Sequence, residues 1–256
     1  MTAAELVVMV AVASIASGLG AIAGGTSLFT VPTLIVLGVD PHTAVATNIA
    51  GLTALSGAAA ARLARAGALS ARPALPLAAM SLPAGALGAA AALSMSVLAL
   101  EVVIGVAMLG LALFLAARPQ FGRAPSHPSR RLLVLGYALA LALGIYSGLF
   151  SGGYATLLTF VCVACFGTSL LEGIAATKVV NLVSSGAAAI VFAFAGAIDW
   201  TLAAVLLPSM AAGGLAGASL AARVSGGSLH RLLVLAILAL GIVMVVRSLG
   251  GLPEAT

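Results

Sequence analysis

Long apolar runs alternate with short polar, glycine- or proline-containing segments along the whole chain. The runs fall at about 4–37, 42–63, 73–92, 97–117, 131–165, 170–195, 200–222 and 228–249. A helix needs roughly 20 apolar residues to cross a hydrocarbon core about 30 Å thick. Since most of the runs have this length, the pattern predicts an all-α polytopic membrane protein with about eight transmembrane helices.

The first and fifth runs are too long for one straight span, because 34 or 35 helical residues would measure about 50 Å. Each contains a double glycine, Gly24-Gly25 or Gly152-Gly153. Glycine disfavours helix by about 1 kcal/mol, and irregular backbone in a membrane persists only where it is buried in protein or lines a cavity. We therefore expect both helices to be broken at these glycines. The alternative use of such glycines is close packing between helices.

The chain also carries an internal repeat. The two double glycines lie 128 residues apart, and "TAVATN" at 43–48 resembles "GIAATK" at 173–178 with a spacing of 130. A nearly constant spacing over half the chain predicts two homologous halves of four helices each. Two fused repeats are typical of transporters that bind their substrate at the repeat interface.

The predicted halves are residues 1–117 and 131–256, joined by the polar linker 118–130. Four spans per half would make the repeats parallel, related by an axis along the membrane normal. With the N-terminus inside, eight arginines lie on the cytoplasmic side and two outside, in agreement with the positive-inside rule. We accordingly expect the protein in the inner membrane, with the linker and both termini on the cytoplasmic side.

Composition excludes several classes of protein. Of the 256 residues, 62% are hydrophobic and only 7% are charged, against about 25% charged in a soluble domain. A soluble enzyme is therefore excluded, and the net charge of +5 is too scattered for nucleic-acid binding. Cys162 and Cys165 lie inside an apolar run and are expected to be buried packing residues.

Neither a catalytic nor a metal-binding motif is found in the sequence. His42, His127 and His230 fall near helix ends and share no ligand spacing. The spans contain no GxSxG, HExxH or paired carboxylates. We therefore expect no enzyme activity, no cofactor and no metal, and the predicted partners are a small anion and the lipid bilayer.

Lys178 is the only lysine of the chain. If its helix starts near Leu170, Lys178 lies about 12 Å into the membrane, where a lysine costs about 2.5–3.5 kcal/mol on insertion scales. Such a residue usually marks a transport pathway or has a partner. The alternatives are pairing with Glu172 or extension of the side chain to the interface.

Polar residues accompany Lys178 in both halves. Thr177 is its neighbour, Asn181 lies one turn further on, and Thr47 and Asn48 occupy the matching positions of the first half, so that Asn48 aligns with Lys178. The N-termini of broken helices carry a partial positive charge that suits an anion. Because no Asp or Glu lies in the middle of a run, the sequence predicts an anion-selective site.

The sequence resembles the sulfite exporter TauE/SafE family. The resemblance rests on "GLGAIAGGTSLFTVPTLIVLGVDPHTAVATN" at 18–48 and on the second copy, "GIYSGLFSGGYATLLTFVCVACFGTSLLEGIAATK" at 144–178. It implies a secondary transporter that moves a small sulfur-containing or organic anion, such as sulfite, thiosulfate or a sulfoacetate-like compound, through a site between the repeats. An anion channel is the alternative function.

The resemblance also implies where the site lies. One part would be formed by Gly24, Gly25, Thr26, Thr47 and Asn48, and the other by Gly152, Gly153, Tyr154, Thr177 and Lys178. A proton-coupled carrier needs a titratable group in the path. The candidates are His42, Glu172 and Lys178 itself.

Overall fold

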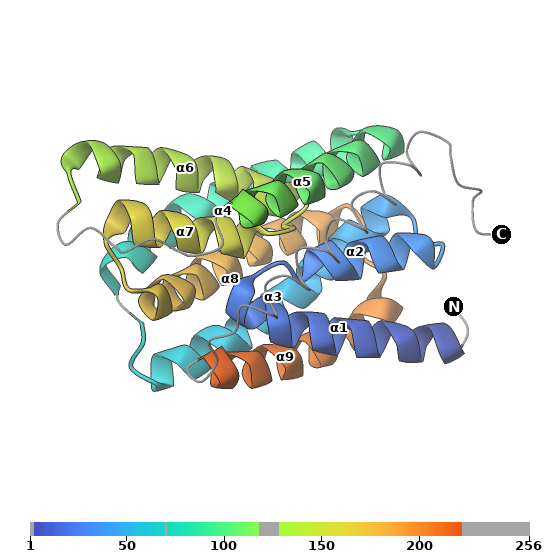
Figure 1. Cartoon of the computed structure of the whole chain (residues 1–256). Coiled ribbons are helices and arrows are strands. Elements are labelled where there is room, and N and C mark those ends of the chain that lie inside the picture. Colours follow the sequence, from blue (N-terminus) through green and yellow to red (C-terminus); the bar gives the residue numbers. More distant parts are fainter. Residues whose placement is uncertain (1–2, 70, 118–127, 222–256) are drawn as a thin grey trace.

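The computed structural model describes residues 3–69, 71–117 and 128–221 (Figure 1). Within these residues all regular structure is helical. The last predicted span, most of the linker and the C-terminus lie outside the described residues. The helices are α1 (Ala3–Ala23), α2 (Ser27–Val36), α3 (Pro41–Arg65), α4 (Ala71–Ser94), α5 (Val97–Ala117), α6 (Arg130–Leu149), α7 (Tyr154–Phe166), α8 (Leu170–Phe194) and α9 (Trp200–Ala221).

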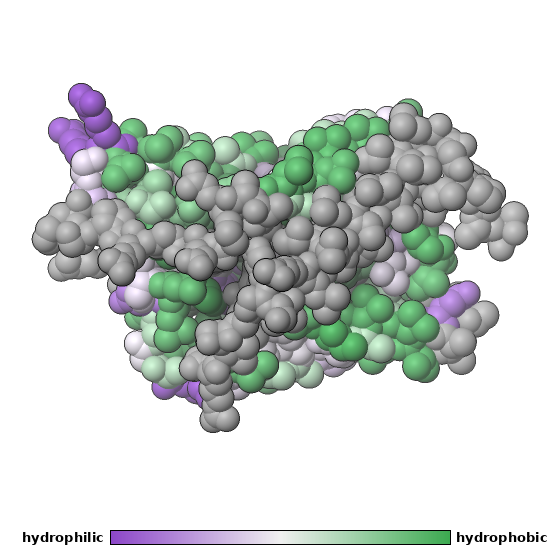
Figure 2. Space-filling view, in the orientation of Figure 1, coloured by the Kyte–Doolittle hydropathy of each residue, from purple (hydrophilic) through white to green (hydrophobic). Residues whose placement is uncertain are grey.

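The described helices form an elongated bundle with an apolar outer surface. Six of them, α3 to α6, α8 and α9, are long and apolar enough to cross a membrane. Side chains such as Leu87, Leu113 and Phe194 point outward and are largely exposed. Figure 2 shows apolar residues along the sides of the bundle and hydrophilic residues towards its ends. The chain is therefore a polytopic helical membrane protein, as predicted.

Both predicted helix breaks are confirmed. α1 and α2 are separated by Gly24 to Thr26, and α6 and α7 by residues 150–153. Gly24 and Gly25 have φ angles of +79° and +91°, and Gly153 has +75°. This left-handed region is open to glycine at little cost and is costly for residues with a β-carbon. The double glycines thus allow the chain to turn sharply between the two helices of each pair.

Close contacts between small residues give the direction of α1. Gly213 of α9 packs against Ser14 of α1, and Gly217 packs against Gly18. Residue numbers therefore increase in the same direction along both helices, so α1 and α9 are parallel. In the same way α9 runs parallel to α3, because Gly51 packs against Met210 and Gly214 packs against Leu55. Because α1 and α3 therefore run in the same direction, α2 must turn back between them. In Figure 1, α1 runs to the middle of the bundle and α2 returns to the end from which α1 started.

The second hairpin, formed by α6 and α7, enters the bundle from the opposite end. Gly144 and Gly148 of α6 pack against Ala84 and Gly88 of α4, which makes these helices parallel. α4 is likewise parallel to α8. The Ser81 hydroxyl of α4 donates to the Val180 carbonyl of α8 at 3.2 Å. Figure 1 shows that α7 returns to the end of the bundle at which α6 begins.

The two sets of helices are antiparallel to each other. In the contact between α3 and α8, Gly57 packs against Leu182, and Gly186 packs against Thr53. Residue numbers therefore increase along α3 in the direction in which they decrease along α8. It follows that α1 and α6 run in opposite directions. The predicted parallel orientation of the two halves is wrong, because each broken helix folds back as a hairpin instead of crossing the bundle.

The hairpins also correct the predicted topology. α1 begins at one end of the bundle and α6 begins at the other (Figure 1). Ala3, at the start of α1, and Arg130, at the start of α6, therefore lie at opposite ends of the bundle. This arrangement disagrees with the prediction in one respect, because the prediction puts the starts of both helices on the same side. Most of the linker and the C-terminus lie outside the described residues.

Candidate functional site

The tips of the two hairpins meet in the middle of the bundle. A β-carbon added to Gly24 would lie only 2.6 Å from the backbone nitrogen of Thr156, in the first turn of α7. One added to Gly152 would lie 2.8 Å from a methyl carbon of Leu28, in the first turn of α2. Only glycine permits these approaches. The N-termini of α2 and α7, each with a partial positive charge, are brought together as a result.

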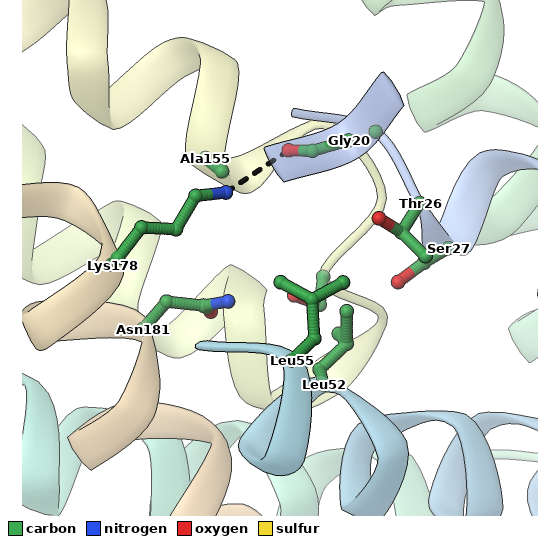
Figure 3. A pocket seen from close by; sticks show the side chains of 10 residues that line it. Gly20, Thr26, Ser27, Leu52, Leu55, Ala155, Lys178 and Asn181 are labelled. Carbon is green, nitrogen blue, oxygen red and sulfur yellow. Dashed lines mark hydrogen bonds between the residues drawn. The ribbon is translucent and has the colours of Figure 1, made fainter. Parts of the chain in front are cut away.

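A small, partly open cavity lies beside the first hairpin tip. Both tips, α3 and α8 contribute to its wall, and none of the lining residues is acidic. Figure 3 shows the polar side chains of α8 and the first tip across from two leucines of α3. The lining residues are Gly20, Gly25, Thr26, Ser27, Leu52, Leu55, Ser151, Ala155, Lys178 and Asn181.

The Lys178 side chain is the only cationic group of this cavity wall. It is 2% exposed, and its Nζ donates to the carbonyl oxygen of Gly20 at 3.0 Å (Figure 3). Gly20 lies in the last turn of α1, where the carbonyl groups carry the negative end of the helix dipole. The same oxygen also accepts from the backbone N–H of Gly24 at 2.9 Å. The lysine is thus partnered by the C-terminal end of a helix.

Both alternative interpretations of Lys178 are wrong. The side chain does not extend to the interface, since it is buried. Glu172 is not its partner, because the Glu172 carboxylate accepts from the backbone N–H and the hydroxyl of Ser169, each at 2.8 Å. Ser169 and Glu172 form a capping box at the start of α8.

The Asn181 side chain lines the cavity one turn after Lys178. Its Nδ2 donates to the Ser56 hydroxyl of α3 at 2.8 Å, and its Oδ1 accepts from the Ser185 hydroxyl at 3.2 Å. These bonds fix the orientation of the amide at the contact between α3 and α8. Asn181 therefore lines the cavity with a fixed amide group beside Lys178.

The predicted first-half residues divide into two groups. Gly25 and Thr26 line the cavity, whereas Thr47 and Asn48 do not. The Asn48 amide donates to the Ser27 hydroxyl at 2.8 Å and accepts from Thr30, so it holds the first turn of α2. The Thr47 hydroxyl accepts from the backbone N–H of Asp199 at 3.1 Å, at the start of α9.

The predicted second-half residues, Lys178 and Asn181 apart, lie outside the cavity wall. Gly152 and Gly153 form the turn of the second hairpin, and Gly153 packs against Leu111 of α5. Thr177 accepts from the Thr159 hydroxyl at 3.2 Å. Tyr154 is fully buried, and its hydroxyl has no hydrogen-bond partner.

The two residues proposed for proton coupling lie at opposite ends of the bundle. The His42 ring, at the start of α3, contacts the Met95 carbonyl at 3.1 Å and the Asp40 carboxylate at 3.8 Å. Glu172 is occupied in the capping box at the start of α8. Neither lines the cavity.

The sequence prediction missed six of the residues that line the cavity: Gly20, Ser27, Leu52, Leu55, Ser151 and Ala155. Ser27 and Ser151 adjoin the double glycines in the sequence, and this proximity was a usable signal. Leu52 and Leu55 gave no signal, because leucine is ordinary in an apolar helix. They give the cavity an apolar wall opposite Lys178 and Asn181.

Comparison with known proteins identifies the family. The family model described as "Sulfite exporter TauE/SafE" matches residues 9–244. A probable membrane transporter protein, ORF9, of a Sinorhizobium species is 30% identical over 233 residues, which are 90% of this chain and 88% of that protein. A probable membrane transporter protein of Haemophilus influenzae is 30% identical over 220 residues, or 85% and 84% of the two chains. No solved structure matches the chain. As the sequence resemblance suggested, this membrane transporter belongs to the sulfite exporter TauE/SafE family.

Proposed function

We propose that the protein is a secondary transporter of a small anion with a single negative charge, which it binds in the cavity between the two hairpin tips. The observation that carries the proposal is the buried amino group of Lys178, whose hydrogen-bond partner is a main-chain carbonyl. A charge without a carboxylate partner is expensive in a membrane. An anion in the cavity would offset that cost.

The remaining wall supports an anion over a cation. Thr26, Ser27 and Ser151 supply hydroxyl groups, and the first turn of α2 supplies the positive end of a helix dipole. A cation site would need carboxylates, and none lines the cavity. A single lysine without a second cationic neighbour in the wall favours one negative charge over two.

The apolar wall formed by Leu52 and Leu55 bears on the substrate class. It offers no hydrogen bonds to the far side of a bound oxyanion, and it accommodates a methyl or methylene group. Bisulfite, a short sulfonate and a short carboxylate all fit these conditions. The family description, which names sulfite export, supports a sulfur oxyanion or its organic derivative.

We further propose that residues 1–117 and 131–256 are inverted repeats. In support, α9 packs on α1 and α3 as α4 packs on α6 and α8, and the two hairpins enter from opposite ends. Inverted repeats with discontinuous helices are a common transporter design. Because the tips touch each other at Gly24 and Thr156, they obstruct an open pore, which favours a carrier over a channel.

The distribution of charge suggests an orientation in the inner membrane. Among the described residues, all five arginines lie where helices begin or end at one face of the bundle: Arg62, Arg65, Arg72, Arg130 and Arg131. At the opposite face the helices begin with Glu5, Asp40 and Asp199. The positive-inside rule then places the arginine face in the cytoplasm, and the N-terminus outside.

Cysteine labelling in intact cells tests this orientation. In a background without the two buried native cysteines, Gly38→Cys should react with a membrane-impermeant maleimide, and Ser129→Cys should react only after permeabilisation. Both positions are exposed. The reverse pattern would overturn the orientation, and reaction of both in intact cells would overturn the hairpin arrangement.

Transport itself is tested with purified protein in proteoliposomes. Radiolabelled methanesulfonate, sulfite and thiosulfate are offered separately, with protein-free liposomes as the control. We expect saturable uptake of a singly charged species above the control. Equal, unsaturable fluxes of all three would indicate a channel, and the absence of any protein-dependent flux would reject the proposed anion class.

A further inference from the structure

Lys178 is the only side chain of the cavity wall that can exchange a proton near neutral pH. The coupling candidates His42 and Glu172 lie at the two ends of the bundle, held by Met95 and Ser169 respectively. A substrate in the cavity is therefore in direct reach of one titratable group. This placement raises the question of which charge state the lysine has when the cavity is empty.

The elements around Lys178 provide no fixed counter-charge in the described cavity wall. α2 and α9 contain no charged residue within their bounds, and α1 has only Glu5, at its start. α3 carries His42 at its start and Arg62 and Arg65 at its end, and Arg72 lies at the start of α4. These residues lie at the two faces of the bundle, far along their helices from the cavity.

The titratable groups on α6 and α7, and the carboxylate of α8, complete this inventory. α6 has Arg130 and Arg131 at its start and contributes Tyr137 and Tyr146, and α7 contributes Tyr154, Cys162 and Cys165. Tyrosine and cysteine are ordinarily neutral at neutral pH. The acidic residue of α8, Glu172, is held by the capping box. Nothing in this set fixes a positive charge on Lys178.

The observed bond of Lys178 is compatible with both of its charge states. A neutral amine and an ammonium group each have an N–H that can donate to the Gly20 carbonyl oxygen, 3.0 Å away. A carboxylate partner would have held the proton on the lysine. A carbonyl does so far less, and burial in the membrane interior opposes an uncompensated charge.

We propose that Lys178 carries the coupling proton, so that one proton and one singly charged anion bind and leave the cavity together. This inference rests on the proposed function. In the empty site the amine is neutral and donates to Gly20. The anion enters with a proton from water on the same side, the proton binds the lone pair of Nζ, and an ammonium–anion pair forms. On the other side anion and proton return to water, so that no net charge crosses.

The chain allows a direct measurement, because Lys178 is its only lysine. Protein labelled with [13C]lysine in nanodiscs gives one ε-carbon signal, whose chemical shift distinguishes amine from ammonium. At a fixed, mildly alkaline pH we expect the anion-free protein to give the amine signal. Adding the anion that was transported among methanesulfonate, sulfite and thiosulfate should convert it to the ammonium signal. An ammonium signal throughout, without anion, would overturn the proposal.

Proteoliposomes supply a second, independent measurement on the wild-type protein. With methanesulfonate, which has no membrane-permeant neutral form near neutral pH, an alkaline interior should drive about tenfold accumulation per pH unit, since one proton accompanies each anion. Pyranine inside the vesicles should report proton entry at the rate of anion entry. Anion uptake with no proton entry would overturn the coupling and leave the proposed function intact. If no anion among the three is transported, the proposed function fails instead, and the anion-free signal of Lys178 still decides its charge state.

Lys178→Arg separates charge from proton exchange, because arginine does not lose its proton in proteins. We expect this variant to lose accumulation driven by the pH gradient, and any anion-for-anion exchange that it retains should not depend on that gradient. Accumulation equal to that of the wild type would show that another group carries the proton. Should the variant not fold, the two wild-type measurements above decide the question.

Discussion

α3 and α8 are the two central helices of the molecule, and they share one scaffold. Each has 25 residues, and their starts, Pro41 and Leu170, lie 129 positions apart. Each is capped at its N-terminus by a side chain, and each is followed two residues after its end by a glycine with a positive φ angle, Gly67 and Gly196. In both, a threonine of the preceding short helix bonds to a residue 18 positions later.

The same two helices differ in the chemistry that they offer. With the spacing of 129, Lys178 corresponds to Ile49 and Asn181 corresponds to Leu52. The cavity thus has a polar wall from α8 and an apolar wall from α3. The comparison teaches that the scaffold occurs twice, whereas the charged group of the site occurs in one copy only.

Lys178→Met should have the largest effect on transport, because it removes the charge and keeps a side chain of similar length. Loss of one partner of a buried charged interaction costs about 2–5 kcal/mol, so we expect uptake to fall by at least about 100-fold. Expression and thermal stability should stay near normal, since the variant adds no buried charge and the Gly20 carbonyl oxygen still accepts from the Gly24 N–H. Uptake in proteoliposomes and a thermal melt measure the two effects.

Ile49→Met is the matched control for that variant, at the corresponding position of α3. An exchange of buried aliphatic side chains usually costs less than about 1.5 kcal/mol, and transport should remain within a factor of two or so of the wild type. Normal transport by Lys178→Met would show that the lysine is structural. Equal losses in both variants would mean that packing, and not charge, matters at this level of the two helices.

Gly24→Ala should come next, and its main effect is on stability. The alanine would be strained at a φ angle of +79°, and its β-carbon would clash with the first turn of α7. Gly38→Ala is the control, because Gly38 has φ +86° and nothing within 4 Å of the added carbon. Strain alone costs about 1–3 kcal/mol. We expect a lower melting temperature for Gly24→Ala than for Gly38→Ala, and loss of transport in Gly24→Ala alone.

Asn181→Leu makes the two central helices more alike, since the corresponding residue of α3 is Leu52. It removes one hydrogen-bonding side chain from the cavity and leaves the Ser56 hydroxyl without its donor. A lost hydrogen bond to a buried group costs about 1–3 kcal/mol, so the apparent KM for the transported anion should rise roughly tenfold. Ser185→Ala, which removes only the hydroxyl behind Asn181, should change KM much less. An unchanged KM in Asn181→Leu would remove Asn181 from the site.

The sequence was sufficient to predict the helix breaks and the central place of Lys178. Glycine pairs inside overlong apolar runs have a direct structural consequence, as does a single lysine among apolar residues. Counting apolar runs could not predict the hairpins, because a broken helix that folds back has the same hydropathy as one that crosses the membrane. For this reason the parallel orientation of the two halves was mispredicted, together with the placement of the starts of α1 and α6 on the same side.

The predicted alignment of Asn48 with Lys178 failed for a smaller reason. The motif comparison gave a spacing of 130, while the helix starts and the bonds from Thr30 and Thr159 give 129. One residue turns a helix position by about 100°, so Asn48 corresponds to Thr177. This shift explains why Asn48 supports α2 and does not face the cavity, and why Leu52 escaped notice.

The smallest effects are expected at the caps of the two helices. Glu172→Ala removes the capping box of α8, and Asp40→Ala removes the cap that accepts from the backbone N–H groups of His42 and Thr43 at the start of α3. Loss of such a cap costs about 0.5–2 kcal/mol, so each variant should lower the melting temperature by a few degrees. Because neither residue lines the cavity, the accumulation of anion driven by a pH gradient should equal that of the wild type in both. If Glu172→Ala alone lost this accumulation while uptake was otherwise retained, Glu172 at the start of α8, and not Lys178, would carry the coupling proton. The two helix ends would then be alike as caps but different in function.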